Sequence, residues 1–303
     1  GHSGAVRGHR HGFGGGGRSL LQHGLRLCGT SFRGILETGQ AFEISILASG
    51  STGNSLYLET TEKKILVDAG LSGKKIESLM QQVGKNPADL DAILVTHEHS
   101  DHIQGVGVLA RRYDLEVYAN ELTWKAMDKH LGKIPVEKKK IFEMGKKITF
   151  GDMDIESFGV SHDAVAPQFY RFYKDNKSFV MLTDTGYCSD HIRGVIKGAD
   201  AYLIESNHDL EMLRMGGYPW TLKQRILGDK GHLSNEDGAL VMTDVLTDKT
   251  KRVYLGHLSR ENNLVELAHM TMEDTLKRYD FGVGETFDIY DTSPDIACEP
   301  FVL

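Results

Sequence analysis

Residues 97–102 read HEHSDH and directly follow the apolar run LDAILVT, residues 90–96. Three histidines and one aspartate therefore lie within six positions, at the end of a predicted buried strand. Strand ends are a usual place for binding sites in α/β proteins. Because neutral imidazole and carboxylate groups are ligands of zinc, manganese and iron, the stretch predicts a metal site.

The spacing within this stretch indicates more than one ion. On a turn that leaves a strand, His97 and His99 can converge on one ion, whereas Asp101 and His102, one step further on, can face a second. A single tetrahedral ion has no need of four ligands from one loop. We therefore expect two metal ions at this site.

Three further metal donors follow predicted strands downstream. His162 follows IESFGVS, Asp184 follows SFVMLT and His257 follows RVYLG. Taken singly, each is better explained as a hydrogen-bonded loop residue than as a metal ligand. The recurrence of a donor in the first turn after an apolar strand indicates that the three complete the metal site, and a carboxylate such as Asp184 can bridge two cations.

Strand and helix patterns alternate along the chain from residue 42. Alternating and fully apolar runs predict strands, and apolar residues three to four apart predict helices. Two strand-rich halves, each closed by helices, predict an α/β fold in which two sheets form a sandwich covered by helices on both outer faces. Strands are expected over 42–49, 55–61, 63–70, 91–96, 115–119, 146–150, 153–160, 168–174, 178–184, 201–206, 252–258 and 285–291. Helices are expected over 72–84, from about 102 to 113, over 121–131, as two short helices after 206, over 234–246 and over 263–278.

The first 41 residues differ in composition from the rest. Residues 1–40 contain 12 of the 34 glycines, five arginines and one acidic residue, together with the tract GFGGGG. This composition predicts a disordered leader or a non-native extension, and the many arginines with few acids also fit a mitochondrial-type presequence. Residues 42–303 are expected to form one globular hydrolase domain.

The globular part is acidic. Residues 41–303 carry 30 lysines and arginines against 41 aspartates and glutamates, a formal charge of −11. This excludes nucleic-acid binding through a broad positive face, so a phosphate-bearing substrate needs a local positive centre such as bound metal ions.

There is no apolar stretch of about 18 residues, so no membrane contact is expected. Three widely spaced cysteines indicate free thiols in a reducing compartment, and we expect a cytoplasmic location.

The stretch THEHSDH, residues 96–102, resembles the HxHxDH signature of the metallo-β-lactamase superfamily. The resemblance narrows to the YycJ/WalJ proteins of Gram-positive bacteria and runs from about Phe42 to about Tyr290. It rests on the motifs LASGSTGNSLYLE, LVDAGLSGKKIE, GVSHDA, LTDTGY, IESNHD, GHLSNEDGA and GHLSREN. The resemblance implies a four-layer αββα sandwich, in which Asp68 of LVDAG orients the metal loop.

The resemblance also implies a set of metal ligands. Seven positions carry the expected residue type: one ion lies on His97, His99 and His162, the other on Asp101, His102 and His257, with Asp184 bridging. Zinc and manganese both suit these ligands. A zinc β-lactamase of the commonest class has a cysteine at the position of Asp184, so antibiotic hydrolysis is not expected.

The activity that the resemblance implies is that of a metal-dependent 5′-to-3′ exonuclease with DNA as its substrate. We expect a hydroxide that bridges the two metals to attack phosphorus, with Asp184 and Asp101 as catalytic residues. His232 in KGHLSNEDGA is the candidate to bind a phosphate oxygen or to protonate the leaving oxygen. His208, Asn207 and Arg260 are weaker candidates for substrate contacts.

Two other functions remain open on the residues alone. A small-molecule hydrolase for a lactone, thioester or cyclic nucleotide can use the same two metals, with residues 212–228 as the cover of a lidded pocket. A regulatory metal-binding protein is the second alternative, and the resemblance to the YycJ-type proteins implies that it would be linked to cell-wall signalling. A nuclease instead predicts that His232 points at the metals and that the cleft admits a strand.

Overall fold

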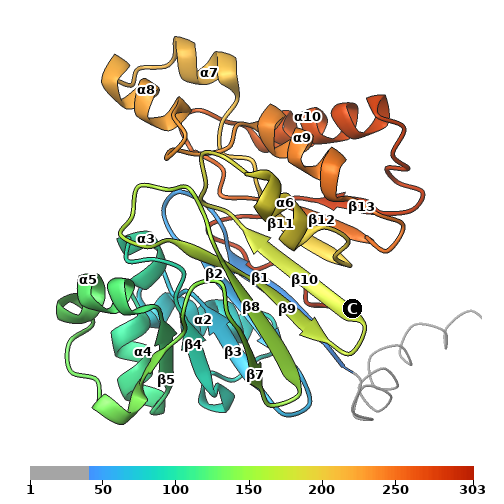
Figure 1. The fold of residues 1–303 in the computed structure, drawn as a ribbon. Helices are drawn as coiled ribbons and strands as arrows, with labels where there is room; N and C mark the ends of the chain where they lie inside the picture. Colours follow the sequence, from blue (N-terminus) through green and yellow to red (C-terminus); the bar gives the residue numbers. More distant parts are fainter. Residues whose placement is uncertain (1–40) are drawn as a thin grey trace, which may run out of the picture. The chain divides into compact units, whose positions relative to one another are not determined.

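The computed structural model describes residues 41–303, which form two seven-stranded sheets packed face to face (Figure 1). Along the first sheet the strands follow the order β14–β1–β2–β3–β4–β5–β6, and along the second the order β13–β12–β11–β10–β9–β8–β7. The first sheet comprises β1 (Glu43–Ala48), β2 (Ser55–Glu59), β3 (Lys64–Val67), β4 (Ala92–Leu94), β5 (Glu116–Ala119), β6 (Lys139–Ile141) and β14 (Phe301–Val302). The second comprises β7 (Lys147–Phe150), β8 (Met153–Gly159), β9 (Gln168–Lys174), β10 (Lys177–Leu182), β11 (Ala201–Glu205), β12 (Arg252–Gly256) and β13 (Asp288–Tyr290).

Helices cover the outer face of each sheet, so the predicted αββα sandwich is confirmed (Figure 1). Apolar residues of α2, α4 and α5 pack on the first sheet, and those of α6, α9 and α10 pack on the second. None of the helices in residues 41–303 has the length and apolarity to cross a bilayer. The helices are α2 (Gly73–Gln82), α3 (Ser100–Ile103), α4 (Val106–Tyr113), α5 (Glu121–Leu131), α6 (Asp190–Ile196), α7 (Leu210–Met215), α8 (Trp220–Leu227), α9 (Asn235–Val245) and α10 (Val265–Arg278), with 3-10 turns at Pro87–Asp89 and Val136–Lys138.

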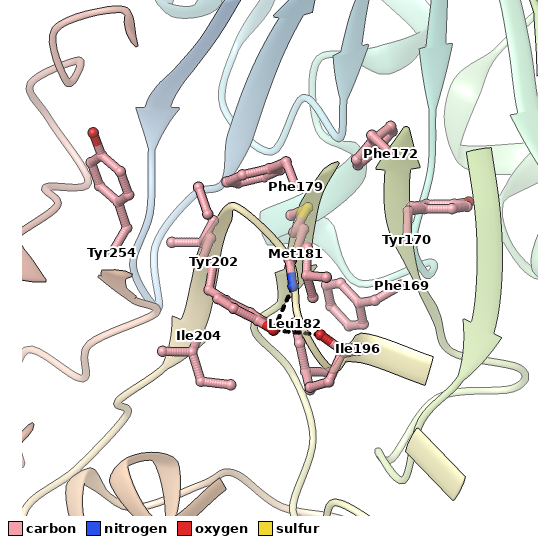
Figure 2. Close-up of a cluster of buried hydrophobic side chains, with 14 of the residues drawn as sticks. Phe169, Tyr170, Phe172, Phe179, Met181, Leu182, Ile196, Tyr202, Ile204 and Tyr254 are labelled. Carbon is pink, nitrogen blue, oxygen red and sulfur yellow. Dashed lines mark hydrogen bonds between the residues drawn. The ribbon is translucent and has the colours of Figure 1, made fainter. Parts of the chain in front are cut away.

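Aromatic side chains of the second sheet fill much of the core. Phe172 and Phe179 are fully buried with ring centroids 6.5 Å apart, and Figure 2 shows them beside Met181. Tyr202 is also buried, and its hydroxyl accepts from Ala199 N (3.0 Å) and donates to Ile196 O (2.5 Å). Burial of each large aromatic side chain contributes about 2–3 kcal/mol to folding. This packing fixes the second sheet as the rigid support for the strand ends.

Two polar contacts tie the sheets together just before the HEHSDH stretch. The hydroxyl of Tyr170 on β9 donates to Val95 O (2.7 Å), and Gln168 N donates to Thr96 O (3.1 Å). The first sheet thus delivers residues 97–102 at the edge where strands of the second sheet also end.

The single helix expected from about 102 to 113 is wrong, because the structure has two. Helix α3 ends at Ile103 and α4 begins at Val106, with Gly105 between them. Gly105 N donates to Ala69 O (2.7 Å), and a Cβ on Gly105 would lie 2.4 Å from Leu71 O. The chain bends here because the backbone of residues 69–71 packs directly against it. Such a long-range contact leaves no periodic signal in the sequence.

Other boundaries agree within a few residues, and two short strands were not expected. Helix α2 begins after Ser72, whose hydroxyl accepts from Lys75 N (3.2 Å), as its sequence predicts. Strand β6 lies within the lysine-rich run 137–147, and β14 lies at the end of the chain. Both are edge strands of two or three residues, too short for an alternating pattern. The leader predicted over 1–41 lies, except for Ala41, outside the described residues.

Candidate metal centre

The HEHSDH stretch turns sharply between strand β4 and helix α3. His99 is the residue that precedes α3, and Asp101 and His102 lie within this helix. On one side Asn54 clamps the loop, since its backbone N donates to Asp101 O (3.0 Å) and its Nδ2 donates to Asp101 Oδ2 (3.3 Å). The turn of residues 50–54, which joins β1 to β2, therefore positions Asp101.

Asp68 fixes the loop of residues 96–102 through hydrogen bonds to Thr96 and a contact with His102, as the family resemblance implies. Its carboxylate is fully buried and accepts from Thr96 N (2.8 Å) and Thr96 Oγ1 (2.7 Å). The same carboxylate lies 2.7 Å from His102 Nδ1. Because Asp68 occupies Nδ1, the other ring nitrogen of His102 is directed to the metal donors.

Gly70 is required by the close approach of the loop to residues 68–70. A Cβ on Gly70 would lie 1.6 Å from Asp101 O, which is far inside van der Waals contact. We expect Gly70→Ala to displace the loop, to lower the free energy of unfolding by at least about 2 kcal/mol and to reduce bound metal. Thermal unfolding and metal analysis measure both effects.

Gly194→Ala in α6 is the matched control, because a Cβ there meets no atom within 4 Å. This change should raise the free energy of unfolding by roughly 0.5–1 kcal/mol, the usual gain in a helix interior. If Gly70→Ala behaves like Gly194→Ala, the close approach does not determine the loop.

The structure brings all seven predicted metal donors together. They form two groups, and within each group the ligand atoms lie within 4.8 Å of one another: His97, His99 and His162, and Asp101, His102, Asp184 and His257.

Asp184 belongs to the second group and also contacts the first. Its Oδ2 lies 2.7 Å from His102 Nε2 and 3.3 Å from His97 Nε2, and its Oδ1 lies 3.4 Å from His257 Nε2. One carboxylate therefore contacts histidines of both groups.

These donors fit divalent cations. Within residues 41–303, His97 Nε2, His257 Nε2 and Asp184 Oδ1 are buried and have no hydrogen-bonding partner, although they lie close together. Buried polar atoms are normally satisfied, and unsatisfied nitrogen and oxygen atoms that lie this close together are suited to bind metal ions. The buried imidazole and carboxylate set suits zinc and manganese.

Glu205, the last residue of β11, is a site residue that the sequence analysis did not name. Its Oε2 lies 2.9 Å from His232 Nδ1 and 3.3 Å from His257 Nδ1. Its Oε1 accepts from Leu233 N (2.8 Å) and Thr185 N (3.2 Å). The signal was present, because AYLIE places an acid at the end of an apolar strand, as SFVMLTD does for Asp184.

His232 lies against the metal donors, as the nuclease interpretation predicts. Its Nδ1 is 3.2 Å from Asp184 Oδ1, and the neighbouring Ser234 caps α9 by accepting from Asp237 N (3.0 Å). With Glu205 and Asp184 at Nδ1, the ring of His232 still lines the adjoining cavity and its side chain is 23% exposed. His232 is therefore, like His99, a partly accessible imidazole of this cluster.

The pKa values show how the charges balance. Burial alone would raise the pKa of Asp184, but the imidazoles of His257 and its neighbours hold it well below its usual range. Burial lowers the pKa of His97 to about 4. Burial also opposes charge on His257, yet Asp184 raises the pKa of His257 to about 9. Protons on some imidazoles thus offset the buried carboxylates, a role that a divalent cation takes over when it binds.

The three predicted substrate residues lie in different surroundings. Asn207 lines the cavity next to the metal donors, and its Nδ2 donates to His257 O (2.9 Å). His208 is buried, and its Nδ1 lies 3.1 Å from Asn207 Oδ1. Arg260 is exposed and pairs with Asp295 at 3.5 Å. Of the three, only Asn207 borders the cavity.

The cavity has a volume of about 310 Å³ and joins the metal donors to helix α8. His99, His162 and His232 line it together with Tyr218, Leu222, Arg225 and Ile226. The segment considered as a cover, 212–228, therefore does border the site.

Comparison with known proteins agrees with this geometry. The Beta-lactamase superfamily domain matches residues 63–258. The exodeoxyribonuclease WalJ of Streptococcus pneumoniae is 67% identical over 84% of this chain and 96% of its own length. The chain belongs to the WalJ/YycJ family of the metallo-β-lactamase superfamily. The exodeoxyribonuclease YycJ of Bacillus anthracis is a second relative in this family, 61% identical over 82% of this chain and 95% of its own length.

Among solved structures, the metallo-β-lactamase fold protein YhfI of Bacillus subtilis has the same fold as this WalJ/YycJ family member. Its TM-score is 0.64 at 16% identity, over 86% of this chain and 99% of YhfI.

The contact of Glu205 with His232 and His257 gives one test of the site. We expect Glu205→Gln to lower kcat by about 10- to 100-fold, because the amide replaces an acceptor that holds Nδ1 of His232 and His257. Steady-state kinetics and metal content of the purified variant measure this. Glu266→Gln, at an exposed acid of α10, should match the wild type. An unchanged kcat in Glu205→Gln would show that the charge of Glu205 is not needed to orient His232 and His257.

Proposed function

We propose that this chain is a metal-dependent exodeoxyribonuclease that degrades DNA from 5′ to 3′. The observation that carries the proposal is the pair of donor groups joined by Asp184, in a chain whose relatives at 61–67% identity are named exodeoxyribonucleases. A site for divalent metal agrees with both the fold family and the buried unsatisfied donors.

The number and placement of the ions form part of the proposal. One ion is assigned to His97, His99 and His162, and the other to Asp101, His102 and His257, with Asp184 shared. Two divalent ions, zinc or manganese, supply an activated water and neutralise the charge of a phosphate under attack. In an acidic chain they provide the local positive centre that the substrate requires.

The side chains of this site then have distinct tasks. Asp184 and Asp101 hold the metal centre together from the β10 strand end and from α3. Glu205 orients His232 through Nδ1, which leaves Nε2 to hold a proton for the leaving oxygen. Asn207 lies at the cavity wall, where its Nδ2 donates to His257 O and holds the side chain in place.

The two alternative functions are less well supported. Helix α8 does border the cavity, as a lidded small-molecule site requires, but the position of His232 against Asp184 is what the nuclease predicts. A purely regulatory protein has no use for seven gathered donors, three of which have a buried ligand atom without a hydrogen-bonding partner. The names of the close relatives also favour the nuclease.

Digestion of 5′-labelled DNA by the purified protein tests the proposal. With manganese or zinc, the label should leave as mononucleotide or short product before the 3′ part of the strand is shortened, and metal analysis should find two ions per chain. No digestion with either metal would overturn the nuclease function. A location in the cytoplasm fits the free thiols of Cys188 and Cys298 and is tested by cell fractionation.

A further inference from the structure

Lys230 is a cation at the metal cavity that the function proposed above does not use. It lies in the loop of residues 228–234, which joins α8 to α9, two positions before His232. Its backbone O accepts from Asp163 N (3.1 Å), and the backbone O of Gly231 lies 3.1 Å from Nδ1 of the metal donor His162. The backbone of Lys230 is therefore held next to the segment that carries this donor.

Lys230 has no acidic partner, unlike the other basic residue of this cavity. The basic side chains that line the cavity are Arg225 and Lys230. Arg225 is paired with Asp163, at 2.6 Å. Lys230 is exposed, and among residues 41–303 no carboxylate lies within ion-pair distance of it. In a chain whose residues 41–303 carry a formal charge of −11, an unpaired ammonium group beside the metal donors attracts an anion.

A second cavity adjoins the same two residues. It has a volume of about 350 Å³ and is lined by His162 and Lys230 together with side chains that follow β8 and β10. Because His162 and Lys230 also line the first cavity, the two cavities share this boundary next to the metal donors. Lys230 is thus accessible to a ligand in either cavity.

The lining of the second cavity suits a phosphate group. None of the described residues that line it is acidic. Tyr187 lines it with a side chain that is 56% exposed. Ser189 also lines it, and its Oγ accepts from Ile192 N (3.2 Å), which leaves the hydroxyl proton to donate. An ammonium group and hydroxyl groups are typical donors to phosphate oxygens.

We infer that the second cavity binds a phosphate group of the DNA other than the one under attack. Lys230 is its charged donor, and Tyr187 and Ser189 are its hydroxyl donors. Because the metal ions neutralise the attacked phosphate, Lys230 is left to a neighbouring one. A phosphodiester of the strand and a terminal phosphate present the same non-bridging oxygens, so either fits this chemistry. The inference names a binding site for the substrate and rests on the nuclease function proposed above.

Binding to a DNA duplex with a 3′-fluorescein label, followed by anisotropy in the presence of manganese, tests the inference. All proteins carry Asp184→Asn so that the DNA is not digested. We expect Lys230→Ala to raise Kd about tenfold, the lower end for a hydrogen bond between charged groups, because Lys230 is exposed. Lys230→Arg should keep most of the affinity, because the charge is kept. Lys197→Ala, at an exposed lysine after α6 that lines neither cavity, is the matched control and should leave Kd unchanged.

A second variant tests the cavity itself. Tyr187→Phe removes only the hydroxyl and should raise Kd about threefold, as expected for one neutral donor. The dependence of Kd on salt gives a readout that a purely structural role does not change. Loss of one phosphate contact in Lys230→Ala should reduce the slope of log Kd against log salt by about 0.9, whereas Tyr187→Phe should leave the slope unchanged.

Neutralised phosphates identify the group that Lys230 binds. One linkage at a time is replaced by a methylphosphonate, and in a separate duplex the terminal 5′ phosphate is omitted. The parent protein should bind one of these duplexes about tenfold more weakly, whereas Lys230→Ala should bind it as it binds the unmodified DNA. An internal linkage assigns the site to a phosphodiester, and the end of the strand assigns it to a terminal phosphate.

Three results would overturn the inference. The first is an unchanged Kd in Lys230→Ala, and the second is a loss that adds to the loss from every neutralised phosphate. The third is that the phosphate identified is the one that the wild type cleaves, since Lys230 then contacts the attacked group and the second cavity is not its site.

The two proposals fail in different ways. If the protein with Asp184 intact digests no DNA but binding depends on Lys230 and on one phosphate, the nuclease function is wrong and the phosphate site stands. If digestion is efficient and binding is indifferent to Lys230, the nuclease function stands and the phosphate site is wrong.

Discussion

Replacement of Asp184 by asparagine is expected to reduce DNA digestion by about three orders of magnitude or more. Asp184 contacts histidines of both donor groups, with Oδ2 at 2.7 Å from His102 Nε2 and Oδ1 at 3.4 Å from His257 Nε2. Loss of a residue that hydrogen-bonds a metal ligand usually lowers metal affinity or activity by about 10- to 100-fold. Loss of the carboxylate that is itself shared by the two donor groups is therefore expected to lower activity further. The rate of release of labelled nucleotide measures the effect.

Metal analysis separates the cause of this loss from simple unfolding. Asp184→Asn should retain its thermal transition without metal but bind less metal, because an amide oxygen is a weaker ligand than a carboxylate. Asp190→Asn, at an exposed aspartate in the first turn of α6, is the control and should digest DNA like the wild type. Full activity in Asp184→Asn would mean that the observed nuclease is a contaminant or that the site lies elsewhere.

Replacement of His232 by alanine is expected to have the second large effect and to lower kcat by about 10²- to 10⁴-fold. The imidazole lies 3.2 Å from Asp184 and lines the cavity, so its loss removes a proton donor placed next to the metal donors. In contrast to Asp184→Asn, this variant should keep its metal. Single-turnover kinetics with saturating enzyme measure the change in the chemical step.

A substrate with a better leaving group gives a further readout for His232. An activated aryl phosphodiester needs no protonation of the leaving oxygen, so His232→Ala should lose far less of its rate on it than on DNA. His191→Ala, at an exposed histidine of α6, should change neither rate. If His232→Ala loses metal, or loses both rates equally, His232 is a metal ligand and not a proton donor.

Local patterns in the sequence were enough to predict most elements of the fold and to propose the candidate metal donors, which the structure places close together. Strands β10, β11 and β12 carry unbroken apolar runs, and α5 has the bounds that its spacing predicts. Metal donors also leave a local signal, because a histidine or aspartate directly after a buried strand is unusual. Asp184 and His257 were recognised in this way, and the family resemblance grouped them with residues 97–102.

Contacts between distant segments could not be predicted in the same way. The pairing of Glu205 with His232 joins residues 27 positions apart, and its 2.9 Å contact depends on how α9 packs beside β11. The break at Gly105 depends on the backbone of residues 69–71. In both cases the cause is the packing of one element on another, which single-residue patterns do not record.

The sequence by itself determined the chemistry of this protein, because side-chain types at strand ends decide which ions can bind and which reactions they can support. The tertiary structure alone decided the distances between Asp184 and the other donors, and how Glu205 holds His232. The physical reason is that ligand identity is a property of single residues, whereas distance and orientation arise only when both sheets and their helices pack together.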